Sequence, residues 1–337
     1  MFSTVSDMDV AIVAMDGVAD LGLTAVLETF ALADRLRHRL VAPPSPWRVH
    51  TVSTGSSIQS GNGYTVPTVA LGDLQFHSDA AAVPGVLIVP AVQIGDPQEL
   101  IAHVSGVGSR PILDWIGRAH SAGVHIAGAC AGTFFLAEAG VLDGLPATTS
   151  WWLGPAFRKR YTAVDLDESL TVCRTESVVT AGAYLAHVDL ALSLIHTASP
   201  ALAEKTARFL VTGSARAQAD HIVPEVMAQG NSLLAGFEHW VRRNIGEQFR
   251  ISTAAHELGI TERSLQRITQ AELGMSPKDF VHDIRIAHAA HLLRTTSLSL
   301  ESIASRVGYL NAGTLRNLVR RRRGMSVAEL RAIPNVW

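Results

Sequence analysis

Cys130 is the residue of the first two thirds of this sequence whose type and setting best suit it to chemistry. An apolar segment, His125–Ala129, runs directly into the thiol, and small residues lead on into an apolar helical pattern that ends at Gly140. Such a tight turn from strand to helix holds one side chain above the carboxyl edge of a sheet, at the N-terminus of a helix. The positive end of the helix dipole there lowers the pKa of a thiol and favours the thiolate. We therefore weigh ligand contact at Cys130 against the simpler interpretation of a small residue tolerated at a crowded turn.

A nucleophilic cysteine also needs a neighbouring base and a group that orients this base. The sequence around Cys130 contains no obvious pair of this kind. His125 precedes the thiol by five residues but falls within the predicted strand, where a packed core histidine is expected. We therefore predict that the protein is not an enzyme.

Residue types suited to binding DNA gather near the C-terminus, where one short pattern occurs twice. The first copy spans residues 251–276 and the second spans 300–326, and both close on Gly-Met-Ser. Gly259 corresponds to Gly308 and Leu265 to Leu315, so each copy predicts a short helix, a glycine turn and an amphipathic helix. Two copies in register predict a paired helix-turn-helix that binds double-stranded DNA.

The second helix of each copy supplies the candidate DNA-contacting residues. Thr261 and Asn311 stand where a helix N-cap is expected, and Leu265 and Leu315 are expected to face inward. The candidates are the two caps and the polar residues that follow them: Thr261, Arg263, Ser264, Gln266, Arg267, Asn311, Thr314, Arg316, Asn317 and Arg320. We expect the run 320–323 to face phosphates or solvent. A helix that begins at Ser276-Pro277 joins the copies, and its length could set the recognition helices about 34 Å apart, one turn of duplex.

The distribution of charge agrees with a DNA partner. The chain of 337 residues has a net charge of −2, yet residues 240–337 hold 15 Lys and Arg against 8 Asp and Glu. A basic C-terminal part and an acidic N-terminal part are typical of a nucleic-acid-binding domain joined to a separate sensor. Apolar residues at 47% and charged residues at 17% indicate a globular protein.

Several function classes are disfavoured by composition. Two cysteines argue against a disulfide framework, and no signal peptide or apolar run of the ~18 residues that cross a bilayer is apparent. We expect a cytoplasmic protein without a membrane partner. None of the 14 histidines forms a pair with convincing metal-site spacing, and Gly61-Asn62-Gly63 fits a hairpin turn better than a phosphate loop. We therefore expect no metal or cofactor.

The elements that must position Cys130 alternate between strands and helices, which predicts an α/β fold with a parallel sheet. Strands are expected at 9–15, 47–53, 86–90, 125–129, 170–175 and 177–180, and residues 66–71 are expected to form another strand or the arm of a hairpin. Helices are expected at 23–40, 111–121, 131–140, 184–197 and 201–211. Residues 213–232, rich in Gly, Ala, Gln and Pro, are expected to link this domain, residues 8–212, to an all-α domain at 233–337.

Two family resemblances rest on these motifs. Residues 233–337 resemble the double helix-turn-helix domain of AraC/XylS-type transcription regulators, in both repeats and in the two Gly-Met-Ser signatures. Residues 8–212 resemble the DJ-1/PfpI class of the glutamine-amidotransferase-like superfamily. The matching segments are Pro84-Gly-Val-Leu-Ile-Val-Pro-Ala, Ala129-Cys130-Ala-Gly-Thr and Thr148-Thr-Ser-Trp151. This order of domains is that of the GlxA-like regulators.

The resemblance implies a flavodoxin-like sandwich that forms a homodimer through the N-terminal domain and binds a small-molecule effector. It places Cys130 at the elbow, Glu28 of the first helix near it, and Asp20 as a further candidate for effector contact. Ala131 stands where peptidase-like relatives carry His, and Ser150 stands where related regulators often show His. Two alternatives to an effector-controlled regulator remain: a DJ-1-superfamily enzyme fused to a DNA-binding domain, or a redox sensor that uses Cys130.

Overall fold

The computed structural model describes residues 9–71, 85–210 and 232–332. The chain divides into two compact units, residues 1–218 and 219–337. The linker expected at 213–232 lies outside the described residues except for Ser232, which begins helix α9.

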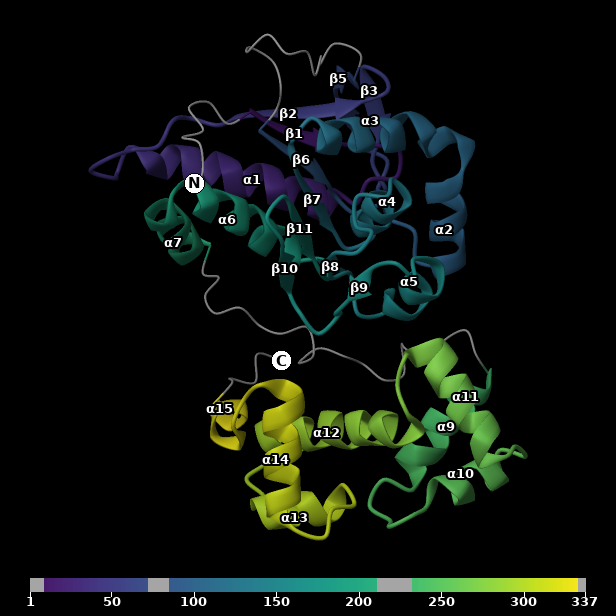
Figure 1. Cartoon of the computed structure of the whole chain (residues 1–337). Helices are drawn as coiled ribbons and strands as arrows, with labels where there is room; N and C mark the ends of the chain where they lie inside the picture. The colour runs from purple at the N-terminus through teal and green to yellow at the C-terminus, as the bar shows by residue number, and fades with distance from the viewer. Residues whose placement is uncertain (1–8, 72–84, 211–231, 333–337) are drawn as a thin grey trace. The chain divides into compact units, whose positions relative to one another are not determined.

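A seven-stranded sheet forms the centre of the N-terminal unit (Figure 1), in the order β10-β11-β7-β6-β1-β2-β5. Its strands are β1 (Asp9–Val13), β2 (Arg48–Ser53), β5 (Val69–Ala70), β6 (Val86–Val89), β7 (His125–Ala129), β10 (Val172–Arg174) and β11 (Val178–Ala181). Neighbouring strands are parallel except β10 and β11, which are antiparallel. The prediction of an α/β fold with a parallel sheet is therefore confirmed.

Helices cover both faces of this sheet, because successive strand residues point to opposite sides. Val10 and Ile12 pack in one core with α1 (Asp20–Arg37), α6 (Ala186–Ala198) and α7 (Pro200–Phe209). Ala11 and Val13 pack in the other core, with α2 (Pro97–Ser105), α3 (Arg110–Ser121), α4 (Gly132–Glu138) and α5 (Gly154–Arg160). The strands are buried on both faces, which explains why they appear in the sequence as continuous apolar runs.

Some elements of this unit differ from the sequence prediction. Helices α2 and α5 were not predicted, although Asp96 accepts backbone N–H bonds and Pro97 opens α2, as capped helices often begin. The segment at 66–71, predicted as a strand or the arm of a hairpin, contains two short strands, β4 (Thr65–Pro67) and β5. Strand β4 pairs antiparallel with β3 (Ser57–Gln59), which confirms the hairpin turn at 61–63. A further small parallel pair joins β8 (Pro146–Ala147) to β9 (Asp165–Leu166).

In its described residues, the regular elements of the C-terminal unit are all helices, and they are arranged around α12 (Figure 1). Its helices are α9 (Ser232–Arg243), α10 (Ile251–Glu257), α11 (Glu262–Leu273), α12 (Pro277–Thr295), α13 (Leu300–Arg306), α14 (Ala312–Arg323) and α15 (Val327–Ala332). Leu265 and Leu315 are fully buried, as predicted. Within the part of the chain that the structure describes, no helix is both long and apolar enough to cross a membrane.

Candidate functional site

Cys130 occupies the predicted elbow between β7 and α4. Its backbone φ is +55°, a left-handed conformation that no other non-glycine residue of the described ranges adopts. This conformation costs an L-residue about 1 kcal/mol, so the surrounding structure must hold it. The Cys130 N–H donates to the Ala181 carbonyl at 2.9 Å, and the Thr149 hydroxyl donates to the Cys130 carbonyl at 2.7 Å. The next turn packs equally closely, because a Cβ on Gly132 would collide with the Val89 and Pro90 carbonyls.

The thiol is buried and hydrogen-bonded. Cys130 is 4% exposed, and the Ser150 hydroxyl donates to its Sγ at 2.8 Å. Burial raises the pKa of the thiol, while the hydrogen bonds from Ser150 and from the Ala131 N–H lower it by less. The expectation of a thiolate was therefore wrong: the loss of solvation disfavours the charge more than the helix N-terminus and its donors favour it.

The two acidic partners predicted from the sequence, Glu28 and Asp20, make contacts with other groups. The Glu28 side chain is 74% exposed and lies 4.0 Å from Arg35 of the same helix, so the structure does not place it at the thiol as the resemblance implied. Asp20, at the start of α1, accepts the Asn62 backbone N–H at 3.0 Å and its side-chain amide at 2.9 Å. A hydrogen bond from the Ser60 side chain, followed by these bonds from Asn62, lowers the pKa of the Asp20 carboxyl. Asp20 therefore anchors the β3–β4 hairpin to the N-terminus of α1.

His187 is a polar residue at the same sheet edge that sequence reasoning did not select. Its Nδ1–H donates to the Tyr184 carbonyl at 2.7 Å, and its Nε2 accepts the Ala91 N–H at 3.2 Å. Burial lowers the pKa of the imidazole to about 4, so the ring is neutral at physiological pH. A Cβ on Gly22 of α1 would lie 2.7 Å from Nε2. In the sequence, this packed imidazole is indicated only by a glycine at residue 22, which leaves room for the ring.

Aromatic side chains adjoin the Ser150 loop. Trp151 is buried, and its ring centroid lies 5.3 Å from that of Trp152. Trp152 in turn stacks on Tyr184, with centroids 5.9 Å apart and planes inclined by 22°. Tyr184 is 48% exposed, so this cluster of three aromatic rings extends from the residue next to Ser150 out to solvent.

The two helix-turn-helix motifs have the predicted caps. The Thr261 hydroxyl accepts the Ser264 N–H at 3.1 Å, and the Asn311 side chain accepts the Thr314 N–H at 2.8 Å. Both recognition helices, α11 and α14, end at a left-handed glycine, Gly274 or Gly324. The linking helix α12 is capped at Ser276, as expected.

The candidate DNA-contacting residues are presented to solvent. Ser264 is partly buried, and the other nine are exposed: Thr261, Arg263, Gln266, Arg267, Asn311, Thr314, Arg316, Asn317 and Arg320. Their inner neighbours Leu265, Thr269, Leu315 and Val319 are buried. Each recognition helix therefore has a polar outer face and a packed inner face, as a helix that enters the major groove requires.

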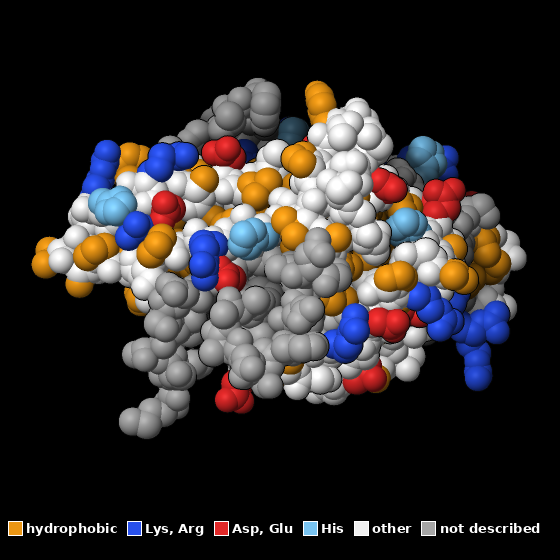
Figure 2. Space-filling model, turned by 90° about the horizontal axis from the view of Figure 1, so that it is seen from above, with side chains coloured by type: hydrophobic (Ala, Val, Ile, Leu, Met, Phe, Trp, Pro, Cys, Tyr) orange, Lys and Arg blue, Asp and Glu red, His pale blue; other side chains and the backbone are white. Residues whose placement is uncertain are grey.

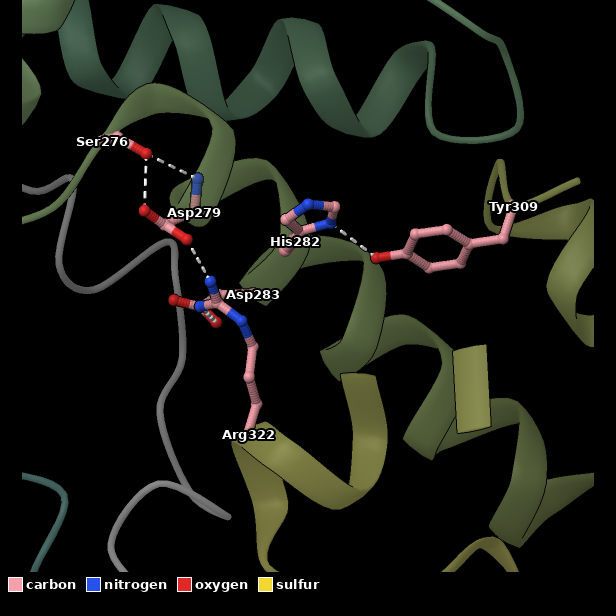
Figure 3. A network of polar contacts seen from close by, with 6 residues as sticks. All are labelled: Ser276, Asp279, His282, Asp283, Tyr309 and Arg322. Atoms are coloured by element: carbon pink, nitrogen blue, oxygen red, sulfur yellow. Dashed lines mark hydrogen bonds and ion pairs between the residues drawn. The ribbon is translucent and has the colours of Figure 1, made fainter. Parts of the chain in front are cut away.

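The arginine run divides in two. Arg320 and Arg321 are exposed, but Arg322 donates to Asp279 and, at 2.5 Å, to Asp283, both on α12 (Figure 3). Arg323 is 7% exposed. The expectation that the whole run faces phosphates or solvent was therefore wrong for its last two residues, of which Arg322 attaches α14 to the linking helix.

The pKa values of the two acids that hold Arg322 are shifted in opposite directions. The Ser276 hydroxyl and then Arg322 lower the pKa of Asp279, whereas burial raises the pKa of Asp283 despite the same guanidinium. Nearby on α12, His282 Nδ1 lies 2.9 Å from the Tyr309 hydroxyl, and the two rings stack (Figure 3). The N-terminal half of α12 is therefore bonded to both the turn and the recognition helix of the second motif.

The charge asymmetry of the sequence is not visible as a patch of one sign on the face drawn in Figure 2. On the face in Figure 2, Lys and Arg side chains are interspersed with Asp and Glu side chains. The basic excess instead includes the exposed arginines of the recognition helices, Arg263 and Arg267 on α11 and Arg316, Arg320 and Arg321 on α14.

Comparison with known proteins agrees with this arrangement. The DJ-1/PfpI family model matches residues 8–197, more than half of the chain. The chain belongs to the DJ-1/PfpI family. A helix-turn-helix domain model matches residues 254–333. The chain, in which a DJ-1/PfpI unit precedes two helix-turn-helix motifs, is a DNA-binding transcription regulator.

Relatives of known name match along most of the chain. The HTH-type transcriptional regulator CdhR of Pseudomonas aeruginosa is 26% identical over 326 residues, which cover 95% of this chain and 90% of the relative. The HTH-type transcriptional regulator GbdR of the same species is 23% identical over 302 residues, with 88% and 77% covered. A putative transcriptional regulator from Vibrio parahaemolyticus has the same N-terminal fold, with a TM-score of 0.50 at 19% identity over 60% of this chain and 99% of the other.

Proposed function

We propose that a small-molecule effector binds beside Cys130 and controls how the two recognition helices engage DNA. The observation that carries this proposal is the left-handed backbone of Cys130. Glycine adopts that conformation without strain, so a cysteine there is best explained by a need for its side chain. The elbow also lies at the carboxyl edge of the sheet, where open α/β folds bind their ligands.

The groups at this edge suit recognition by hydrogen bonding and stacking. The neutral thiol of Cys130 and the Ser150 hydroxyl carry no charge at physiological pH. Trp152 and Tyr184 add a stacked aromatic surface next to them. An effector would gain affinity from polar contacts at the elbow and from apolar contact with these rings.

The same features argue against turnover and against redox sensing at Cys130. A nucleophilic thiol requires a base, and the side chain bonded to Sγ is the Ser150 hydroxyl, which is not one. Oxidation by peroxide also proceeds through the thiolate, which burial disfavours here. We therefore propose a regulator without enzymatic activity, in which the thiol is a contact group.

The output of the regulator is a change in the geometry of DNA binding. An effector shifts an equilibrium only by its difference in affinity between two conformations. We propose that the N-terminal unit forms a homodimer and that effector binding changes the placement of the two DNA-binding units in this dimer. We propose that the protein acts in the cytoplasm, because its partner is double-stranded DNA.

Thermal unfolding of the full chain against a panel of small metabolites tests this proposal. An effector at 100 times its Kd adds about 2.7 kcal/mol, which raises the Tm by about 5–10 °C. We expect the shift in the wild type and in Cys173→Ala, a control at the other buried cysteine, and a much smaller shift in Cys130→Ala. The same compound should change the Kd for DNA in the wild type and in the control variant.

Three results would contradict the proposal. An equal Tm shift in Cys130→Ala would place the effector site elsewhere. Conversion of the compound by the wild type, and not by Cys130→Ala, would establish the enzyme alternative. A change in DNA affinity caused by peroxide in the wild type alone would establish the redox sensor.

A further inference from the structure

Arg285 lies near the middle of α12, where the linking helix meets the turn of the second helix-turn-helix motif and the segment that precedes the first motif. Its guanidinium donates from Nη1 to the Gly308 carbonyl at 3.1 Å and from Nη2 to the Glu247 carbonyl at 2.6 Å. Gly308 is the turn residue of the second motif. Glu247 belongs to the segment between α9 and α10, which leads directly into the first motif.

The same two segments also supply one aromatic ring each. The guanidinium carbon of Arg285 lies 5.0 Å from the ring centroid of Phe249 and 5.5 Å from that of Tyr309. The turn of the second motif and the segment that leads into the first motif therefore each offer this side chain one carbonyl and one ring. Arg suits such a position because its planar fork donates in two directions while its faces stack on rings, which Lys cannot reproduce.

The two segments also contact each other around Arg285. A Cβ on Gly308 would lie 2.5 Å from Arg285 Nη2 and 2.5 Å from the Ile245 carbonyl, so a side chain at residue 308 would push the segments apart. The Gln248 side-chain amide donates to the same Gly308 carbonyl. The segment between α9 and α10, which leads into the first motif, is thus hydrogen-bonded to the turn of the second motif.

We propose that Arg285 is a positioning residue that fixes the spacing and relative rotation of recognition helices α11 and α14. At 8% exposure it is too buried to contact DNA itself. Its effect on DNA binding follows from the rigidity that it gives to the pair. When two binding elements are held in the right geometry, the second contact forms at a high effective concentration, and this advantage falls as the connection loosens. The inference rests on DNA binding by both motifs and not on the effector site.

Arg285→Lys in the full chain tests this role, with Arg294→Lys as the matched control. Arg294 lies on the same helix, is exposed and bonds the Ala290 carbonyl within α12. A DNA duplex with two half-sites is first selected from a random pool with the wild type. Kd values are then measured on this duplex, on duplexes with either half-site scrambled, and on a series with one to three base pairs added between the half-sites.

We expect Arg285→Lys to bind the full site about tenfold more weakly, the equivalent of ~1.4 kcal/mol, and each half-site less than about twofold more weakly. The penalty for inserted base pairs should shrink, because a looser pair tolerates altered spacing. Arg294→Lys should match the wild type in every measurement.

Equal losses on full and half-sites, or an unchanged spacing profile, would overturn the proposal. So would a selection that recovers a single half-site. If Arg285→Lys does not fold, Gln248→Ala replaces it, since Gln248 is exposed and loses only its bond to the Gly308 carbonyl. This variant should show the same changes at smaller amplitude, and wild-type behaviour of Gln248→Ala would then overturn the proposal. If the protein shows these changes on DNA but responds to no effector, the inference about Arg285 holds and the proposed function fails.

Discussion

The two helix-turn-helix motifs share their helix lengths, caps and turns but differ in their surface residues. Helices α11 and α14 are each 12 residues long, begin at a side-chain cap and end at a left-handed glycine. At equivalent positions, however, Glu272 of α11 is replaced by Arg322 of α14, and buried Thr269 by buried Val319. Helix α11 carries acids beside its arginines, whereas α14 carries no acid. Caps and turns thus define the motif, while the remaining positions decide how it is attached and what it contacts.

The largest expected effect comes from breaking the ion pairs between Arg322 of the second motif and α12. The equivalent residue of the first motif is Glu272, which cannot form such pairs with acids. Arg322→Ala should lower the free energy of unfolding by about 2–3 kcal/mol, because it leaves the carboxylates of Asp279 and Asp283 without their cation. Urea unfolding of the full chain, followed by far-UV circular dichroism, measures this loss.

Arg321→Ala is the control for this variant, since Arg321 precedes Arg322 and is exposed. It should change stability by less than about 0.5 kcal/mol. Similar losses in the two variants would mean that the ion pairs to α12 do not distinguish the second motif.

A second comparison concerns DNA contact at equivalent positions on the outer faces. Arg316 and Gln266 are both exposed one residue after the buried leucine of their helix. Arg316→Ala should weaken binding to a selected duplex by about 1–3 kcal/mol, as the loss of a contact to a guanine edge would. Gln266→Ala should weaken it as well, with altered preference at a different base pair. Titrations on selected and random duplexes provide the measurement.

An equal loss on selected and random DNA would assign Arg316 to phosphate contact. In that case the slope of log K against log salt should become shallower by about 0.9. Retention of full affinity by Arg316→Ala would exclude the outer face of α14 from the interface.

The smallest effect concerns the inner faces. Thr269 is fully buried, and its hydroxyl donates to the Gln266 carbonyl of its own helix at 3.1 Å. Thr269→Val copies Val319 of the second motif and should raise the free energy of unfolding by about 0.5–1 kcal/mol, because it removes a buried hydroxyl with only this local bond. Urea midpoints of this variant and of Val319→Thr, which should be destabilised, check the expectation. A loss of stability in Thr269→Val would show that the hydroxyl supports α11.

The sequence was most informative where the determinants are local. The caps at Thr261, Ser276 and Asn311 depend on residues three positions apart, and all were predicted correctly. The elbow at Cys130 was also predicted, because small residues between a strand and a helix define such a turn.

Features that depend on distant residues could not be predicted in this way. Arg322 bonds to acids that lie 39 and 43 residues away along the chain. Its sequence neighbours therefore do not indicate that the run 320–323 contains an arginine held by ion pairs. The pKa of Cys130 is decided by burial beneath the Ser150 loop, which its neighbours along the chain do not reveal. Glu28 was transferred from a resemblance, but its position along α1 turns it towards solvent.

Both cysteines of the chain, Cys130 and Cys173, are buried, and burial raises the pKa of each thiol. Thiol-directed reagents react with the thiolate and need access to it, so the natural cysteines should be modified slowly in the folded protein. A cysteine introduced at the exposed position 270 of α11 and another at the equivalent position 320 of α14 would then accept spin labels selectively. Pulsed dipolar spectroscopy on such a chain would measure the separation of the two recognition helices in solution, with and without Arg285.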